Sequence, residues 1–446
     1  MGRTCSTRWR PFTAVLCQRR KGAIPLIAPL FNRNYRWLWT GQVVSILGDQ
    51  FRIWSVVYWV FTTSHQSPVA QSLVLIAEIL PVALLGPLAG VWVDRWNRKR
   101  VMVWSDLIRA GISFGLVAAM MSGSLWLVLL LLLASSAVST FFQPASGALI
   151  PALLPPEHLM AANSLSQSTR TVMILLGPAA GTILYQLAGP SLALTVDAVS
   201  FLIAAGCAMM IQYAGQKVSA GESSLGWLGF WRTFAAGIRF GWENATVRSI
   251  FVMLVVMSLA LGAVNTLGIF LVTQELLLPE SYTALAGTAQ GIGMFSGAIA
   301  MGALSKRVRA YNWLTVIGAG VLTVGIGVFA AAPNIIIVMM GRLLLGAGAT
   351  GLSIAITTLF QLAVPEEMLG RVGATLEAAP TLAMLGAAGV SGYAVQWVGT
   401  RAVLGTAGGI SLMAGLVVMV GLGCLRSRPS LPQAGAVAET LRRGGD

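Results

Sequence analysis

The feature that most constrains this fold is a series of long, nearly uncharged apolar runs separated by short polar links. About 20 residues of α-helix cross the hydrocarbon core of a bilayer, and a helix satisfies its backbone hydrogen bonds internally. The sequence therefore predicts an all-α integral membrane protein with twelve transmembrane helices. We place them at 37–62, 69–93, 101–121, 125–148, 163–187, 191–212, 249–273, 281–304, 312–331, 334–360, 373–396 and 401–425.

Composition narrows the function. Of the 446 residues, 56% are hydrophobic and only 10% are charged, against about 25% charged in a typical soluble domain. The net charge of +14 could suggest a nucleic-acid partner, but such proteins gather their bases on a soluble face, whereas here they lie between apolar runs. The four cysteines and two histidines match no metal spacing. We therefore expect no nucleic acid, metal, cofactor or catalytic group, and hence no enzyme.

Lysine and arginine are distributed unevenly among the links. The two tails, the links at 93–100 and 305–311 and the segment at 213–248 hold most of the 29, whereas the links on the other side hold Arg401 alone. Basic links of membrane proteins face the cytoplasm. We therefore expect both termini in the cytoplasm and the helices in the cell membrane.

The longest polar interruption divides the helices into two sets of six. We expect a basic cytoplasmic tail (1–36), a first bundle (37–212), a cytoplasmic linker (213–248), a second bundle (249–425) and a C-terminal cytoplasmic tail (426–446). The linker should contain an amphipathic helix lying on the membrane surface, either as a simple connector or in a regulatory role. Its apolar face would comprise Trp227, Trp231, Phe234, Ile238 and Trp242.

The two halves repeat each other. Pro-Glu pairs at 156–157 and 365–366 have the same offset as Gly177 and Gly386. A duplicated six-helix unit is typical of secondary transporters, whose substrate site lies between the halves near the middle of the membrane. The sequence thus predicts two pseudo-symmetric six-helix bundles around a single small-molecule site, with a monomer as the working unit and membrane lipids around it.

The link GVWVDRWNRKR (90–100) has two interpretations. Its bases alone fit an anchor that fixes the topology. The step from Gly90 to Asp94 fits a gate instead, because glycine permits close helix approach and an acid at the membrane edge accepts hydrogen bonds from a helix N-terminus or an arginine. The second half has Lys306 where the first has Asp94. We therefore expect a gate that depends on Asp94 more than on Lys306.

These motifs resemble the major facilitator superfamily. Gly90, Asp94, Arg95, Arg98 and Lys99 match its pattern G-x-x-x-D-R-x-x-R-K, and LGPAAG resembles the fifth-helix motif of proton-coupled exporters at Gly177, Pro178 and Gly181, with Thr182 where a second glycine is common. The strings NYRWLWTGQVVSILGDQ (34–50), SDLIRA (105–110) and DAVSFLIAA (197–205) resemble the macrolide-efflux and enterobactin-exporter branch. The resemblance covers 31–425 and implies a twelve-helix transporter that exports by alternating access, with the 90–100 link as a clasp between the halves.

Charges inside the spans are candidate functional groups, because each costs about 2.5–3.5 kcal/mol near the bilayer centre. Asp49 and Arg52 share a helix face near mid-membrane, so they either pair structurally or handle substrate or protons. Glu78 lies at similar depth with no base within four residues, so it is either a proton carrier or structural. The spacing of Asp106 and Arg109 predicts a structural or gating pair.

Two further charges, Asp197 and Arg342, are placed by the sequence near span ends, where long side chains can reach the interface. The predicted cavity is then largely apolar, with Asp49 and Glu78 as its few fixed charges, which favours neutral or cationic compounds. The leading hypothesis is a proton-coupled exporter of a hydrophobic drug, macrolide or siderophore. The alternatives are a lysophospholipid flippase, a metabolite importer and a sensor that does not transport.

Overall fold

The computed structural model describes residues 27–213, 239, 242–307, 311–364 and 366–421, which form helices joined by short turns. A short 3-10 turn, η3 (Ala28–Phe31), precedes the first group of helices: α2 (Arg33–Thr63), α3 (Pro68–Arg95), α4 (Arg98–Met121), α5 (Leu125–Leu153) and α6 (Pro156–Met210). The second group comprises α8 (Ala245–Phe270) with its π-helical extension η4 (Leu271–Glu275), α9 (Tyr282–Arg307), α10 (Tyr311–Ala330), α11 (Ile335–Ala363), α12 (Glu366–Val398) and α13 (Thr400–Gly421).

The number of membrane crossings agrees with the prediction. Ten of the described helices are long and apolar enough to cross a membrane. Helix α2 adds an eleventh, with 31 residues that include Asp49 and Arg52. Helix α6 supplies two crossings, because Gly189 has φ 74° and interrupts its 55 residues immediately before Pro190. A positive φ is easily adopted only by glycine. The all-α, twelve-crossing fold is therefore confirmed.

Polar residues in the links begin several helices. The side chain of Asn32 accepts hydrogen bonds at the start of α2, and Ser67, Asn97, Ser124 and Asn334 do the same for α3, α4, α5 and α11. Such caps satisfy backbone N–H groups that have no partner within the helix. Short links can therefore turn the chain between crossings with fewer backbone N–H groups left unpaired.

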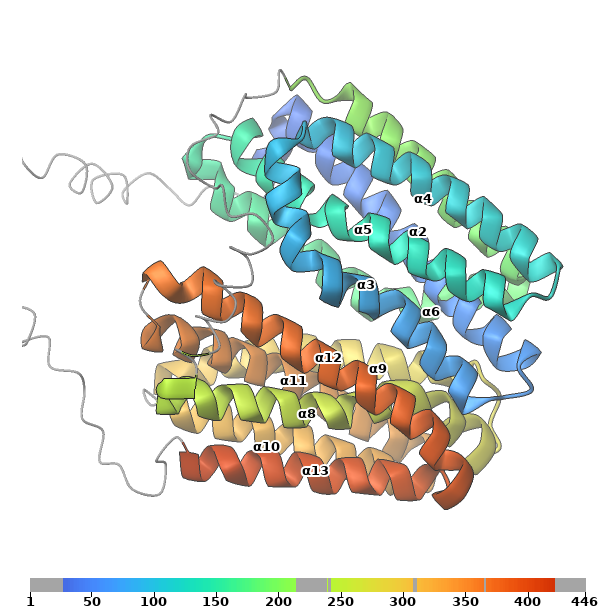
Figure 1. The fold of residues 1–446 in the computed structure, drawn as a ribbon, viewed down its shortest axis with the longest axis vertical. Coiled ribbons are helices and arrows are strands. Elements are labelled where there is room, and N and C mark those ends of the chain that lie inside the picture. Colours follow the sequence, from blue (N-terminus) through green and yellow to red (C-terminus); the bar gives the residue numbers. More distant parts are fainter. Residues whose placement is uncertain (1–26, 214–238, 240–241, 308–310, 365, 422–446) are drawn as a thin grey trace, which may run out of the picture.

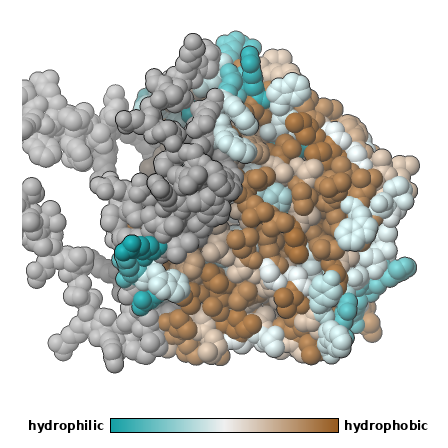
Figure 2. All heavy atoms as spheres, viewed as in Figure 1, coloured by the Kyte–Doolittle hydropathy of each residue, from teal (hydrophilic) through white to brown (hydrophobic). Residues whose placement is uncertain are grey.

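The two groups of helices form two bundles that meet at one end (Figure 1). The most extensive contacts between them are those of α3 with α12 and of α6 with α9. The ribbons diverge towards the end at which α2 begins and α13 finishes, which we call the termini end. Figure 2 shows apolar side chains gathered across the middle of both bundles, with hydrophilic residues near the margins. Such an apolar belt suits contact with lipid chains.

In the second bundle, α9 and α11 approach closely. A Cβ added to Gly293 would lie 2.0 Å from the carbonyl oxygen of Leu343, and one added to Gly346 would lie 2.0 Å from that of Gln290. Small residues allow membrane helices to pack backbone to backbone. This packing fixes α11 against α9, the two helices that supply Arg342 and Gln290 to the site described below.

Most of the linker and both tails lie outside the described residues. The predicted amphipathic face falls there at Trp227, Trp231, Phe234 and Ile238. Its helix and the boundaries of the tails and linker therefore stay predictions.

Candidate functional site

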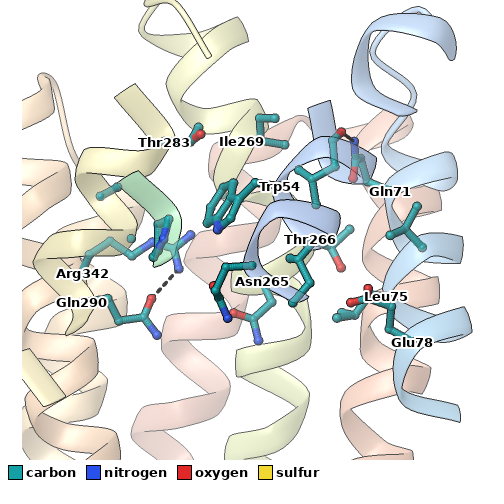
Figure 3. A pocket seen from close by; sticks show the side chains of 18 of the residues that line it. Trp54, Gln71, Leu75, Glu78, Asn265, Thr266, Ile269, Thr283, Gln290 and Arg342 are labelled. Carbon is teal, nitrogen blue, oxygen red and sulfur yellow. Dashed lines mark hydrogen bonds between the residues drawn. The ribbon is translucent and has the colours of Figure 1, made fainter. Parts of the chain in front are cut away.

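A cavity of about 370 Å³ lies between the two bundles (Figure 3). Its wall comes from α2, α3 and α6 on one side and from α8, α9 and α11 on the other. Apolar side chains such as Trp54, Val57 and Ile269 form much of this wall, and Glu78 and Arg342 are the charged residues that line it. A cavity of this size, apolar with a few fixed polar groups, suits a small organic molecule.

Next to this cavity, Arg52 contacts three carboxylates. Its Nη2 donates to Asp49 Oδ1 at 3.1 Å, its Nη1 donates to Glu78 Oε1 at 2.9 Å, and its Nε lies 3.9 Å from Asp197 Oδ2. The acids come from α2, α3 and the second arm of α6. We call these four residues the Arg52 cluster. One guanidinium cannot neutralise three ionised carboxylates, so the cluster has more acid than base.

The place of Asp197 corrects the sequence prediction. Asp197 is fully buried and accepts a hydrogen bond of 2.6 Å from Ser113, so it does not extend to the membrane surface. Its other oxygen, Oδ1, has no hydrogen-bond partner among the described residues. Gly48 permits this packing, because a Cβ there would lie 2.9 Å from Oδ1. The sequence prediction was wrong because position along a span does not reveal which way a side chain points.

A second, smaller cavity of about 120 Å³ lies within the first bundle. It is lined by Asp49 and by polar residues nearer the termini end, among them Gln42, Ser146 and Arg170. Glu78 lines the large cavity and Asp49 lines the small one. Through Arg52, the cluster therefore connects the two cavities.

Arg342 also corrects a sequence prediction. It lies within α11 and lines the large cavity instead of extending to the membrane surface. Its Nη1 donates to Gln290 Oε1 at 3.0 Å, its Nη2 donates to the carbonyl of Val264 at 3.4 Å, and its guanidinium lies 4.5 Å from the centre of the Phe329 ring. The cavity thus has fixed charges of both signs, and the expectation of Asp49 and Glu78 as the few fixed charges was incomplete.

At the end opposite the termini, Tyr58 links the bundles. Its buried hydroxyl forms hydrogen bonds with Thr182 of α6 at 2.9 Å and with Thr283 of α9 at 2.8 Å. Phe61 and Phe270 pack beside it across the same boundary, with ring centres 5.4 Å apart. We call Tyr58, Thr182 and Thr283 the Tyr58 gate. Thr283 also lines the large cavity, so the gate joins the two bundles at the edge of that cavity.

A half-buried acid lies beside this gate. Glu280 is in the link before α9, and its carbonyl accepts a 3.4 Å hydrogen bond from Tyr58. Its side-chain Oε2 is buried without a hydrogen-bond partner among the described residues. Burial raises the pKa of the Glu280 carboxyl above its usual value, because a low-dielectric surrounding disfavours the charged form.

Comparison with known proteins identifies the family. The model of the transmembrane secretion effector family, within the major facilitator superfamily, matches residues 24–433. The chain belongs to this family.

Individual relatives agree with this assignment. The chain is similar to YfiS, an uncharacterized MFS-type transporter of Bacillus subtilis, at 26% identity over 90% of this chain and 96% of that protein. It is 31% identical to macrolide efflux protein A of Streptococcus pyogenes, over 37% of this chain and 42% of that protein. The fold resembles the nucleoside transporter NupG, with a TM-score of 0.71 at 13% identity, covering 86% of this chain and 99% of that one. This protein is therefore a multi-pass membrane transporter.

In this transporter the GPxxG motif packs α6 against α2 beside the cavity. A Cβ on Gly177 would meet the Gln50 side chain at 2.4 Å, and one on Gly181 would lie 2.8 Å from the Trp54 ring. Pro178 lines the cavity and lies 3.0 Å from the position that a Cβ on Gly287 would take. The motif therefore sets the shape of the cavity wall. Thr182, the departure from the pattern, supplies a hydroxyl to the Tyr58 gate.

The 90–100 link is described in part. Gly90, Asp94 and Arg95 fall in the last turns of α3, but their side chains lie outside what the structure describes. Arg98 donates to the carbonyl of Ala148 at 3.0 Å, and Lys99 donates to that of Met209 at 2.8 Å. Both acceptors lie near helix C-termini, where cations are stabilised. These two bases therefore hold helices of the first bundle together.

The predicted pair of Asp106 and Arg109 is present. Arg109 Nη2 donates to Asp106 Oδ1, and both side chains are buried. The Arg109 guanidinium lies over Phe142 at 4.7 Å and over Phe201 at 4.2 Å, measured to the ring centres. Rings from α5 and α6 thus enclose a pair carried by α4. This arrangement favours the structural interpretation, although Arg109 also lines the small cavity.

Proposed function

We propose that this transporter is a proton-coupled exporter of small, largely hydrophobic organic molecules. The observation that carries the proposal is the Arg52 cluster, in which three acids share one base between two cavities. Acids in transmembrane segments that face a cavity commonly serve as proton relays. The cavity wall supports this substrate class, because apolar side chains line much of it and polar groups such as Gln71, Asn265 and Gln290 are available to orient a bound molecule.

Alternating access follows from the arrangement of the bundles. The Tyr58 gate closes one end of the cavity, while the bundles diverge towards the termini end. With both termini in the cytoplasm of a cell-membrane protein, this is the inward-facing state. Opening of the Tyr58 gate and closure of the termini end, with the 90–100 link as the clasp, would release substrate outside.

Proton coupling would depend on competition for Arg52. A proton on Glu78 removes the charge that holds Arg52 Nη1, so the guanidinium can shift towards Asp49 or Asp197. Glu78 lines the substrate cavity, so its protonation also changes the charge that the substrate meets. Asp49 opens on the small cavity, which offers a proton route towards the termini end. Protons would thus leave the substrate cavity at the Arg52 cluster and continue through the small cavity of a monomer.

Export, as opposed to import, is supported by the relatives. Macrolide efflux protein A of Streptococcus pyogenes and the putative bacilysin exporter BacE of Bacillus subtilis are both named for efflux. BacE is 28% identical over 39% of this chain and 42% of that protein.

The test is proton-linked flux in inside-out vesicles with an imposed pH gradient. An internal pH dye reports proton exit when a macrolide, a lipophilic carboxylate or a lysophospholipid is added in turn. We expect compound-dependent proton movement that Asp49→Asn and Glu78→Gln each abolish. Glu275→Gln should leave the proton movement intact, because Glu275 is not part of the Arg52 cluster. It pairs with Arg401 where η4 ends and α13 begins.

Intact gradient-driven transport in both cluster variants would refute proton carriage by these acids. A response to the lysophospholipid alone would favour a flippase. An exporter accumulates the compound inside these inverted vesicles, so release of a preloaded compound would favour an importer, and binding without flux would favour a sensor.

A further inference from the structure

Arg342 is a cation with no counter-charge among the residues that the structure describes. Among the described residues, no carboxylate lies within 4.0 Å of its guanidinium, and its two hydrogen bonds go to the neutral groups of Gln290 and Val264. Its Nε is buried without a partner in this part of the chain. A guanidinium has five N–H donors, so most of its capacity is unused. An unpaired charge in a protein interior is costly, so an anionic ligand that pairs with Arg342 would offset this cost.

The structure holds this guanidinium in a fixed position. A Cβ on Gly268 would lie 2.0 Å from Nη2, so only glycine leaves room for it there. The Phe329 ring lies 4.5 Å from the guanidinium, and Gln290 anchors Nη1 at 3.0 Å. The close packing of α9 on α11 fixes Gln290 in turn. A fixed donor group binds an anion with less loss of conformational freedom than a mobile one.

Arg342 is the positive charge that the described cavity lining offers to a substrate. Glu78 is the other charged residue in the described lining, and its carboxylate is already paired with Arg52. Arg342 and Glu78 lie on opposite sides of the cavity, with Trp54 between them in this view (Figure 3). An anionic group is therefore attracted to the α11 side and repelled from the α3 side. Apolar residues between the two sides can hold a hydrophobic body.

We infer that Arg342 is an anion subsite of the transport cavity, and that the substrate is an amphiphilic organic anion with one carboxylate-like group. This inference rests on the proposed transport function and names its substrate class. It replaces the expectation of neutral or cationic compounds. Arginine matches a carboxylate with two parallel hydrogen bonds, which defines the orientation of the bound molecule. Multiply anionic compounds are disfavoured, because a second anionic group would face Glu78.

The test is equilibrium binding to the full-length protein in detergent. The probes are dansylglycine, which has an apolar ring system and one carboxylate, and its uncharged amide, dansylglycinamide. Hydrogen bonds to charged groups contribute enough for a preference of about tenfold or more. We expect the wild type to bind dansylglycine at least about tenfold more tightly than the amide.

The variants separate charge from folding. Arg342→Gln should reduce the preference to less than about twofold, and Arg342→Lys should retain part of it, because charge remains but the two-pronged geometry is lost. Arg401→Gln is the matched control, since Arg401 pairs with Glu275 away from the cavity, and it should bind like the wild type. A competition in the wild type alone covers the case in which Arg342→Gln does not fold. Octanoate should displace dansylglycine about tenfold better than octanamide.

Equal binding of the two probes to the wild type, or no binding of either, overturns the inference. An undiminished preference for dansylglycine in Arg342→Gln also overturns it, and so does equal displacement by octanoate and octanamide. Probe binding in detergent needs no pH gradient, so the anion subsite and the proton-coupled function are tested independently. A missing preference with intact proton-linked flux defeats only the anion subsite. A clear preference without proton-linked flux defeats only the proton-coupled function.

Discussion

Replacing Tyr58 with phenylalanine tests whether the Tyr58 gate holds the bundles together. The substitution removes one hydroxyl and keeps the ring, which packs against Trp54 and Tyr185 with ring centres 5.7 and 5.2 Å away. The bond to Thr182 joins residues of the same bundle, so its loss affects the open and closed states alike. Only the bonds to Thr283 and to the Glu280 carbonyl cross between bundles.

The expected size follows from those two crossing bonds. A neutral hydrogen bond contributes about 1 kcal/mol net, and the 3.4 Å bond to the Glu280 carbonyl adds less than the 2.8 Å bond to Thr283. Thr283 keeps its own bond to that carbonyl at 2.5 Å, so it is not left unsatisfied. Tyr58→Phe should thus weaken the closed state by about 1–1.4 kcal/mol, or about five- to tenfold in population.

The population can be read from the reactivity of a cysteine placed on the cavity wall. Ile269→Cys lines the cavity, and the four native cysteines would be replaced first. A membrane-impermeant maleimide, added at the Tyr58 side of oriented vesicles, reacts only when that gate opens. Its reaction rate should rise about five- to tenfold in Tyr58→Phe, in line with the weaker closed state. Tyr185→Phe is the matched control, because it removes a neighbouring hydroxyl without removing a bond to Thr283.

An unchanged rate in Tyr58→Phe would refute the gate, because the crossing bonds would then not set the equilibrium. An equal rise in Tyr185→Phe would attribute the effect to general loosening of the aromatic cluster.

Three further predictions concern other parts of the molecule. Asp106→Asn leaves Arg109 buried without its carboxylate, so the free energy of unfolding in detergent should fall by about 3 kcal/mol or more. Burial raises the pKa of Glu280 above its ordinary value of 4.5. Its stabilisation of the closed gate is therefore complete below that value and lost as pH rises through the raised pKa. The maleimide rate should rise with pH over this range, and Glu280→Gln should remove the dependence. Asp94→Asn should impair transport more than Lys306→Ala, measured as flux per folded molecule.

Each of these has a contradicting outcome. For the buried pair it is a loss of stability no larger than that in Glu275→Gln, which disrupts a partly exposed pair worth less than about 1 kcal/mol. For the acid beside the gate it is the same pH dependence in wild type and Glu280→Gln. For the 90–100 link it is an equal loss of flux in Asp94→Asn and Lys306→Ala, because the link of the first half would then have no larger role than that of the second half.

The membrane crossings could be predicted from sequence because the thickness of the bilayer fixes the length of each crossing. The length of each apolar run can be read from the sequence and compared with that thickness. The pair of Asp106 and Arg109 could be predicted because residues three apart share a helix face. The connection of Arg52 to Glu78 could not, because it joins α2 to α3 and depends on how each helix is rotated about its axis.

Asp197 and Arg342 were misplaced for the same physical reason. Span boundaries are uncertain by several residues, and a charge near a boundary can either reach the interface or point into the bundle. Packing decides between these outcomes, through Ser113 for Asp197 and through Gln290 and Phe329 for Arg342.

The surplus of acid in the Arg52 cluster also bears on the electrical behaviour of transport. With all groups ionised, Asp49, Glu78 and Asp197 outnumber Arg52 by two charges, so the cluster becomes neutral on taking up two protons. Two protons per cycle is therefore the ceiling for uptake without creating a net positive buried cluster. Exchange of two protons for a monoanion would be electrogenic, and each charge moved would draw about 2.3 kcal/mol from a potential of 100 mV. Transport would then generate a current, and the membrane voltage would drive export even without a pH gradient.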